Sequence, residues 1–201
     1  MAYCSHLLVR AHGVYRSAAQ AQAWCQSLPL AVDQLQVFHA KDQALTYLRL
    51  IPGTQTAQDT AAWLAAAQAA APALSAELVE LVWLSSTLSR AGASYEAGAD
   101  TAWHYIVETD ATPEAEDDFN QWYATEHLPG LAAVPGVQWA ERFDGAPSSP
   151  RYHACYDLHT LGTFGSPPWL AVRATAWSDR VRPEFRNTRR TMFQRIASLA
   201  L

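Results

Sequence analysis

Phe119-Asn-Gln-Trp-Tyr-Ala-Thr-Glu-His127-Leu-Pro-Gly130, followed closely by Val134-Pro-Gly136, is the stretch of this chain with the most specific pattern. It sets His127 beside Glu126 at a point where the sequence predicts that a helix ends. The Trp-Tyr pair of the same stretch lies about one helical turn earlier. An unperturbed histidine has a pKa of about 6.5, so a histidine in this place could give or take a proton near neutral pH.

Two interpretations of His127 stay open from the sequence. It could be the general acid or base for a bound compound. Alternatively it could cap the helix C-terminus, where its charge interacts favourably with the helix dipole. Tyr123 is the second predicted catalytic residue, because its hydroxyl could protonate an enolate or hold a carbonyl oxygen. The stripe of Phe119, Trp122 and Tyr123 otherwise predicts packing in the core.

The elements around this stretch occur in the same order in both halves of the chain. In the first half, the patterns predict strands at 5–11, near 35–37, at 45–51 and at 78–84, with helices at 17–28 and 56–70. In the second half, they predict strands at 102–108, 137–143, 152–158 and 191–196, a helix after Thr112-Pro113 and another containing 166–177. This βαββαβ order is that of the ferredoxin-like motif.

We therefore predict an α+β fold with two tandem ferredoxin-like units. Residues 1–86 would form a unit with a degenerate site, residues 87–100 a linker rich in Ser, Gly and Ala, and residues 101–201 the second unit. Each unit leaves one sheet face without helices, and packing the two bare faces together would bury both. The prediction is an internal duplication that forms an intrachain, pseudo-dimeric α/β barrel.

The second half resembles the EthD-like family of the dimeric α/β-barrel superfamily. The resemblance is carried by Phe119-x-x-Trp122-Tyr123-x-x-Glu126-His127-x-Pro129, Val134-Pro135-Gly136, Arg142 before a hairpin, Pro150-Arg151-Tyr152 and the closing segment from Phe185 to Ile196. It covers roughly residues 102 to 196, whereas the first half matches by element order alone.

The resemblance implies a small cytoplasmic protein. Relatives include isomerases, cyclases and monooxygenases that need no cofactor; others bind haem, and many have no assigned activity. This chain departs from the family in two places. The first half reads Cys25-Gln-Ser-Leu-Pro29 after Trp24 and lacks the Glu-His pair, and Gly130 stands where members usually carry an acidic or bulkier residue. We therefore expect one complete site in each chain.

Polar side chains on the predicted strands could line a cavity. Strand alternation makes His104, Arg142 and His153 candidates, although the sequence leaves open which face points inward. With Trp122 and Glu126 they are the predicted ligand-binding residues. The alternative for each strand residue is a satisfied polar group at a barrel seam. Adjacent helix residues do not face each other, so Glu126 is expected to anchor a backbone or arginine partner rather than orient His127.

We predict no metal site and no cofactor. The histidines lack the spacing of a zinc site, and no glycine-rich nucleotide-binding motif follows a strand. Haem stays open as an alternative, because it needs an axial ligand above an apolar cavity and His104 or His153 could supply one.

The composition favours a folded protein and disfavours several classes of partner. Half of the 201 residues are hydrophobic, and the net charge of −5 argues against a nucleic-acid-binding protein. Seven arginines between Arg173 and Arg195 are a local exception, which we interpret as a solvated cationic face. Three scattered cysteines, including Cys4, indicate no disulfide framework, and no run of residues is long enough for a membrane span. We expect a cytoplasmic protein without a membrane or nucleic-acid partner; a homodimer stays open.

The sequence thus predicts a protein that binds a small molecule. Our first hypothesis is a cofactor-free enzyme of the isomerase, cyclase or monooxygenase type, which acts on a hydrophobic oxygenated compound with His127 as acid or base. The alternative is a ligand-binding or structural barrel protein without catalysis.

Overall fold

The computed structural model describes residues 5–53 and 59–201. Cys4 and positions 56–58 of the helix predicted at 56–70 therefore lie outside the described residues. The helices and strands of the first half are β1 (His6–His12), α1 (Ala18–Gln26), β2 (Val32–Ala40), β3 (Leu45–Pro52), α2 (Thr60–Ala70), η1 (Ala71–Leu74) and β4 (Leu78–Ala91). Those of the second half are β5 (Trp103–Ala111), η2 (Pro113–Ala115), α3 (Glu116–Trp122), η3 (Tyr123–His127), α4 (Leu128–Ala132), β6 (Val137–Asp144), β7 (Tyr152–Leu158), η4 (Leu161–Thr163), α5 (Pro167–Arg173), α6 (Ala176–Val181), η5 (Arg182–Glu184) and β8 (Phe185–Ala200).

The strands form one closed barrel in the order β1-β3-β2-β8-β5-β7-β6-β4. The strand pairs within each half run antiparallel, for example β1 with β3 and β5 with β7. Each half shows the βαββαβ order with short helical turns added. The predicted fold class, an α+β chain of tandem ferredoxin-like units that form an intrachain barrel, is confirmed.

The chain divides into two compact units. Unit 1 contains Met1–Ser85 and Met192–Leu201, and unit 2 contains Ser86–Thr191. Two long strands explain why this division differs from the predicted one. β4 continues to Ala91 and so occupies part of the predicted linker, and the end of β8 pairs with β2 in unit 1.

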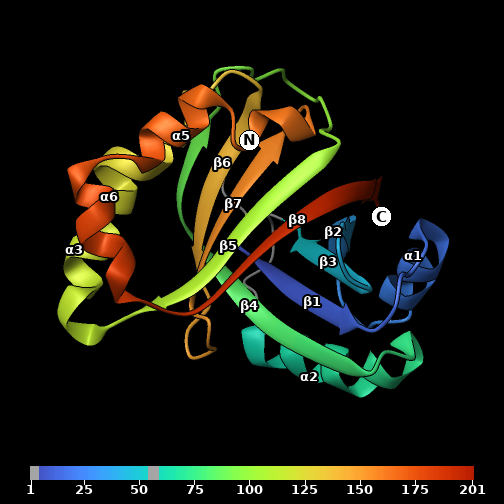
Figure 1. Ribbon diagram of the computed structural model, residues 1–201. Helices are drawn as coiled ribbons and strands as arrows, with labels where there is room; N and C mark the ends of the chain where they lie inside the picture. Colours follow the sequence, from blue (N-terminus) through green and yellow to red (C-terminus); the bar gives the residue numbers. More distant parts are fainter. Residues whose placement is uncertain (1–4, 54–58) are drawn as a thin grey trace. The chain divides into compact units, whose positions relative to one another are not determined.

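Unit 1 has helices α1 and α2 packed on one face of its sheet (Figure 1). The indole of Trp24 in α1 donates a hydrogen bond to the carbonyl of Ala70 at the end of α2, at 3.0 Å. Trp24 therefore belongs to the apolar core of this unit, as do Cys25 and Leu28. Trp24 thus serves the packing between α1 and α2.

Unit 2 positions the candidate site. β7 pairs with β5 on one side and with β6 on the other, and helices α3, α5 and α6 lie over one face of this sheet (Figure 1). The sheet register sets Tyr105 opposite Tyr156 and His104 opposite Asp157. Because side chains alternate along a strand, the tyrosines and the histidine point to opposite faces.

The helix predicted around 166–177 is two helices, α5 and α6. Thr175 interrupts it: its hydroxyl accepts a hydrogen bond from the backbone N–H of Ser178 at 3.0 Å and so begins α6. A threonine in this role competes with a continuous helix, because it satisfies an N–H group that the preceding turn would otherwise bind.

Candidate functional site

The sequence predicts that the helix ends near His127, but the helical run continues past it. It continues from Glu116 through a π-helical turn, Tyr123–His127, into α4, which ends at Ala132. The N–H of Leu128 donates to the carbonyl of Tyr123, five residues back. The next residue, Pro129, has no N–H and cannot approach the carbonyl four residues before it, which favours a widened turn here. Such π-turns are frequent at functional sites.

His127 is buried at the end of this turn, with 7% of its surface exposed. Its ring stacks on Trp122 at 4.0 Å between centroids and 17° between planes, and meets Tyr123 edge-on at 5.4 Å. Burial, followed by the positive charges of Arg182 and Arg173, lowers the pKa of His127 to about 3. The imidazole is therefore neutral near pH 7. Because the helical run continues to Ala132, the alternative of a charged cap on a helix C-terminus does not hold.

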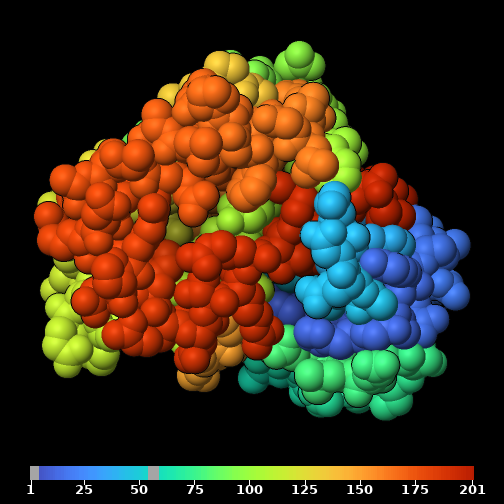
Figure 2. Space-filling view, in the orientation of Figure 1, coloured from blue at the N-terminus to red at the C-terminus, as the bar shows by residue number. Residues whose placement is uncertain are grey.

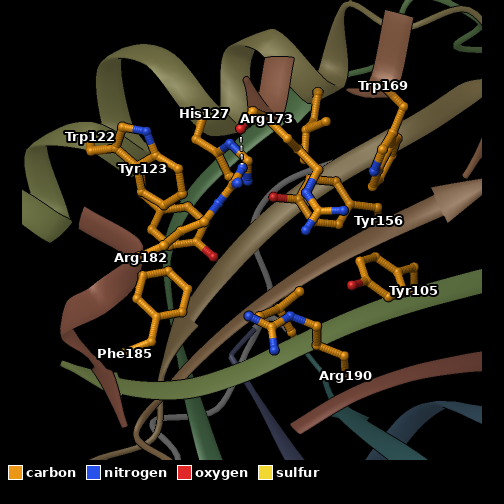
Figure 3. A pocket seen from close by; sticks show the side chains of 12 residues that line it. Tyr105, Trp122, Tyr123, His127, Tyr156, Trp169, Arg173, Arg182, Phe185 and Arg190 are labelled. Carbon is orange, nitrogen blue, oxygen red and sulfur yellow. Dashed lines mark hydrogen bonds between the residues drawn. The ribbon is translucent and has the colours of Figure 1, made fainter. Parts of the chain in front are cut away.

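A pocket beside His127 lies between the helical layer and the strands of unit 2. In Figure 3 the helical segment carries Trp122 and His127, while Tyr105, Tyr156 and Arg190 approach from the strands. The lining residues are Tyr105, Val107, Trp122, Tyr123, His127, Leu131, Tyr156, Trp169, Arg173, Arg182, Phe185 and Arg190. All of them belong to unit 2.

The pocket is narrow and partly open to solvent. The volume that the centre of a water molecule can occupy is about 20 Å³, enough for about one water, and the empty space including the open mouth is about 360 Å³. Figure 2 shows the surface of unit 2 hollowed between segments coloured orange and red. A compound with a ring would enter only if side chains at the mouth moved aside.

Three buried polar atoms on the pocket wall have no hydrogen-bond partner among the residues that the structure describes. They are Nδ1 of His127, the hydroxyl oxygen of Tyr156 and Nε1 of Trp169. A buried polar atom without a partner is unfavourable by about 1–3 kcal/mol, and native proteins contain few of them. All three atoms belong to residues that line the pocket, which indicates a place for a polar ligand or ordered water there.

Three arginines reach the same pocket. Arg173 ends α5, Arg182 begins η5 and Arg190 lies on β8. Arg182 donates a hydrogen bond to the carbonyl oxygen of Arg173, drawn as the dashed line in Figure 3. Within residues 5–53 and 59–201, no carboxylate forms an ion pair with any of the three. Burial and then the charge of Arg173 lower the pKa of Arg182; Asp179 opposes this shift, and the charge of Arg190 adds a smaller lowering effect.

The tyrosines of the pocket stay protonated near neutral pH. Burial raises the pKa of Tyr123 to about 12, although Arg142 opposes the shift. Burial likewise raises the pKa of Tyr156 well above its ordinary value. Both hydroxyls are therefore available as hydrogen-bond donors, and Tyr123 is a weak acid.

Glu126 holds the pocket wall in place without lining it. Its Oε1 accepts hydrogen bonds from the indole N–H of Trp122 at 3.2 Å and from the hydroxyl of Thr175 at 2.6 Å. The carboxylate thus joins the helix that carries His127 to the start of α6. Glu126 therefore anchors other groups, as expected, but the expected backbone or arginine partner is wrong: its partners are an indole and a hydroxyl.

Arg142 lies on the helix-covered face but behind the pocket. Its guanidinium stacks against Phe119, Tyr123 and Tyr152 at 4.6–4.9 Å from the ring centroids, and donates to the side-chain oxygen of Asn120 at 2.6 Å. It does not line the pocket. Arg142 is therefore a cation packed among aromatic rings, and one of its contacts is with the ring of Tyr123.

His104 and His153 lie on the opposite sheet face and do not join His127. Nδ1 of His104 is 2.6 Å from Asp157, and Nδ1 of His153 is 3.4 Å from Glu108. Both histidines are fully buried, and in each case the partner is the residue directly opposite on the paired strand. The structure therefore separates the predicted site residues: Trp122, Tyr123 and His127 meet in the pocket, whereas Glu126, Arg142, His104 and His153 do not line it.

These residues do not fit a haem. His104 and His153 each face a carboxylate within the sheet, and the base of the pocket beside His127 has room for about one water. In the described part of the chain, no group of three His, Cys, Asp or Glu side chains could hold a metal ion. Cys25 and Cys155 are both buried, and no described helix is long and apolar enough to cross a membrane.

The sequence reasoning missed the strand and arginine walls of the pocket. Tyr105 and Tyr156 stack across β5 and β7 at 6.3 Å, and Trp169 meets both edge-on at 5.9 and 5.4 Å. Strand alternation groups Tyr156 with Tyr152 on one face of β7, but only the register between β6 and β7 places Arg142 on that face. The run of seven arginines contained the cationic wall, but its pattern does not distinguish the arginines that pair with carboxylates from those that do not.

Comparison with known proteins identifies the fold. No protein-family model matches the chain, and no curated protein sequence matches it. Among solved structures, an anthrone oxidase-like protein superposes with a TM-score of 0.66 at 13% identity, over 98% of this chain and 94% of the other. A Fusobacterium nucleatum protein provisionally named a monooxygenase gives 0.61 at 11% over 100% and 96%. A heme-degrading enzyme of Listeria monocytogenes gives 0.50 at 10% over 94% and 98%. With these neighbours and its own barrel topology, the chain has the dimeric α/β-barrel fold.

Proposed function

We propose that unit 2 binds a small, hydrophobic, oxygenated compound in the pocket beside His127. The observation that carries this proposal is the set of three buried polar atoms without partners on residues that line this pocket: His127, Tyr156 and Trp169. Aromatic rings form most of the remaining wall, so the compound would have an apolar body and one or more oxygens. The narrow base limits what enters far into the pocket to a small group.

We further propose that the protein is an EthD-like, cofactor-free enzyme that removes a proton from this compound. His127 is neutral near pH 7, which is the form that can accept a proton. Removing a proton beside a carbonyl leaves an enolate, whose negative oxygen would lie near Arg173 and Arg182 and accept a hydrogen bond from Tyr156. The proton goes to His127, and the positive charges that make this histidine a weak base offset the charge of the enolate.

Anthrone is a suitable probe, because it loses a proton next to a carbonyl-bearing ring system to give an aromatic enolate. The fold neighbour named as anthrone oxidase-like suggests it. In deuterium oxide, the wild-type protein should accelerate exchange of the acidic CH₂ hydrogens, measured by NMR in the absence of dioxygen. His127→Phe should abolish the acceleration while keeping a ring that stacks on Trp122. His39→Phe, which changes a half-buried histidine in unit 1, is the matched control.

A ligand-binding protein without catalysis is the second candidate, and the low pKa of His127 favours it. In that case anthrone would raise the unfolding temperature of the protein and be recovered without deuterium exchange above the buffer rate. Equal exchange rates for wild type and His127→Phe would remove the catalytic role of His127. The cytoplasmic location and a further homodimer of barrels also stay proposals; analytical ultracentrifugation tests the latter.

A further inference from the structure

The three arginines of the pocket differ from other arginines of unit 2 in what they contact. Arg151 binds Asp144 at 2.7 Å and Arg180 binds Asp118 at 2.9 Å, so each already has its counter-charge. Arg173, Arg182 and Arg190 form no ion pair in the described chain. They lie close together, because the charges of Arg173 and Arg190 both lower the pKa of Arg182.

Cations that converge without a carboxylate are unfavourable unless an anion joins them. Like charges repel, and the repulsion is stronger where water is partly excluded. Arg173 and Arg182 are half-buried, and Arg182 is further held by its bond to the Arg173 carbonyl. The described residues that line the pocket include no acidic side chain. The missing counter-charge would therefore come from the ligand.

The remaining walls show what else this ligand must carry. Trp122, Tyr123 and Phe185 lie on one side, and Tyr105, Tyr156 and Trp169 on the other. Flat aromatic surfaces favour a flat ring between them, since offset stacking adds to the burial of apolar area. Arginine also presents several N–H donors in a plane, which suits an oxyanion better than a neutral oxygen.

We propose that the pocket selects an aromatic compound whose ring bears an ionised oxygen, a carboxylate or a phenolate, held by Arg173, Arg182 and Arg190. This inference rests on the proposed function, because it names the class of ligand for the same pocket. The anion lies at the mouth, where the three guanidinium groups gather, and the ring points towards His127 and Trp122. Binding requires the arginine side chains to move onto the anion, which widens the narrow mouth.

The test compares two probes that differ in charge but hardly in shape. Binding of 2-naphthoate and of 2-naphthamide to the full chain at pH 7.5 is measured by isothermal titration calorimetry. We expect 2-naphthoate to bind about tenfold or more tightly, since a charge-assisted hydrogen bond is about twice as strong as a neutral one. Raising the salt concentration from about 0.05 to 0.5 M should weaken naphthoate binding and leave naphthamide binding unchanged. A third probe, 4-nitrophenol, tests the phenolate: the bound phenol should ionise at lower pH than the free one, seen in its visible absorbance.

Variants then locate the anion. Arg190→Gln, at an exposed position, and Arg173→Gln should each weaken naphthoate binding about tenfold, with circular dichroism as the check on folding. Arg180→Gln removes the same unit of charge from an arginine that already pairs with Asp118, and should leave binding unchanged.

The outcomes separate this inference from the proposed function. Equal affinity for the amide and the carboxylate would overturn the anion preference while the binding function survived. Binding of neither probe, together with no ionisation of 4-nitrophenol, would overturn both. An equal loss of affinity in Arg180→Gln would show that general surface charge, rather than the pocket, attracts the anion.

Discussion

The pKa of about 3 for His127 leads to a measurable dependence of stability on pH. In the unfolded chain this histidine has an ordinary pKa of about 6.5. Between these two values the unfolded state binds a proton that the folded state does not, so the free energy of unfolding falls as the pH falls. The contribution is fully present above about pH 6.5 and is lost progressively from there down to about pH 3.

The expected size follows from the two pKa values. Each pH unit below 6.5 lowers the free energy of unfolding by about 1.4 kcal/mol, which gives about 3 kcal/mol at pH 4.5 and a limit of about 5 kcal/mol. His127→Phe removes the titrating group and keeps a ring of similar area against Trp122. The variant should therefore lose about 3 kcal/mol less than the wild type on going from pH 7.5 to 4.5.

The assay is urea unfolding followed by far-ultraviolet circular dichroism, at half-unit steps from pH 4.5 to 8. The other histidines and the carboxylates titrate in both proteins and cancel in the difference. Between pH 7 and 8 the difference should be constant, because His127 is neutral in both states there, and this range is the internal control. A difference that stays flat down to pH 4.5 would refute the assignment of His127 as a buried neutral histidine.

Two further predictions concern the packing around the pocket. Gly130→Ala would bring the new Cβ to 2.8 Å from Cγ1 of Val172, so we expect the free energy of unfolding in urea to fall by about 1–2 kcal/mol. Adding Val172→Ala should restore part of this loss. An unchanged stability of the single variant would contradict the close packing of α4 on α5. Glu126→Ala leaves the indole of Trp122 and the hydroxyl of Thr175 without their acceptor, so we expect the free energy of unfolding to fall by about 2–4 kcal/mol. The near-ultraviolet circular dichroism signal of the tryptophans should also weaken. A near-native spectrum would show that the carboxylate does not hold Trp122 and Thr175 in place.

The sequence was sufficient for the architecture because local patterns repeat in both halves. Alternating strands and capped amphipathic helices indicate the element order, and this order is that of the ferredoxin-like motif. Element ends were less predictable. The helix through His127 continues past Pro129, because a π-turn accommodates the proline, and no local pattern distinguishes this turn from a helix end.

The sequence predicts the helical side of the candidate site but not its strand and arginine sides, because those depend on how the strands pair. His127, Tyr123 and Trp122 share one helical segment, so their neighbourhood follows from helical spacing. The strand faces depend on register: a bulge between Val137 and Trp139 and the pairing of β6 with β7 place Arg142 beneath the helices, while His104 faces the other way. Which arginines lack a carboxylate is a property of the folded molecule and cannot be read from spacing.

Arg173 and Arg182 connect the weak basicity of His127 with the proposed preference of the pocket for an anion. The charges of Arg173 and Arg182 add to the effect of burial in lowering the pKa of His127, because they repel the positive charge that a proton would place on its ring. An anion bound to them offsets that repulsion and, by linkage, raises the affinity of His127 for a proton. A substrate that becomes an anion as it loses its proton produces this compensation during the reaction itself. The pocket would thus keep His127 neutral and unreactive when empty, and make it an adequate base only towards a compound whose conjugate base the arginines can hold.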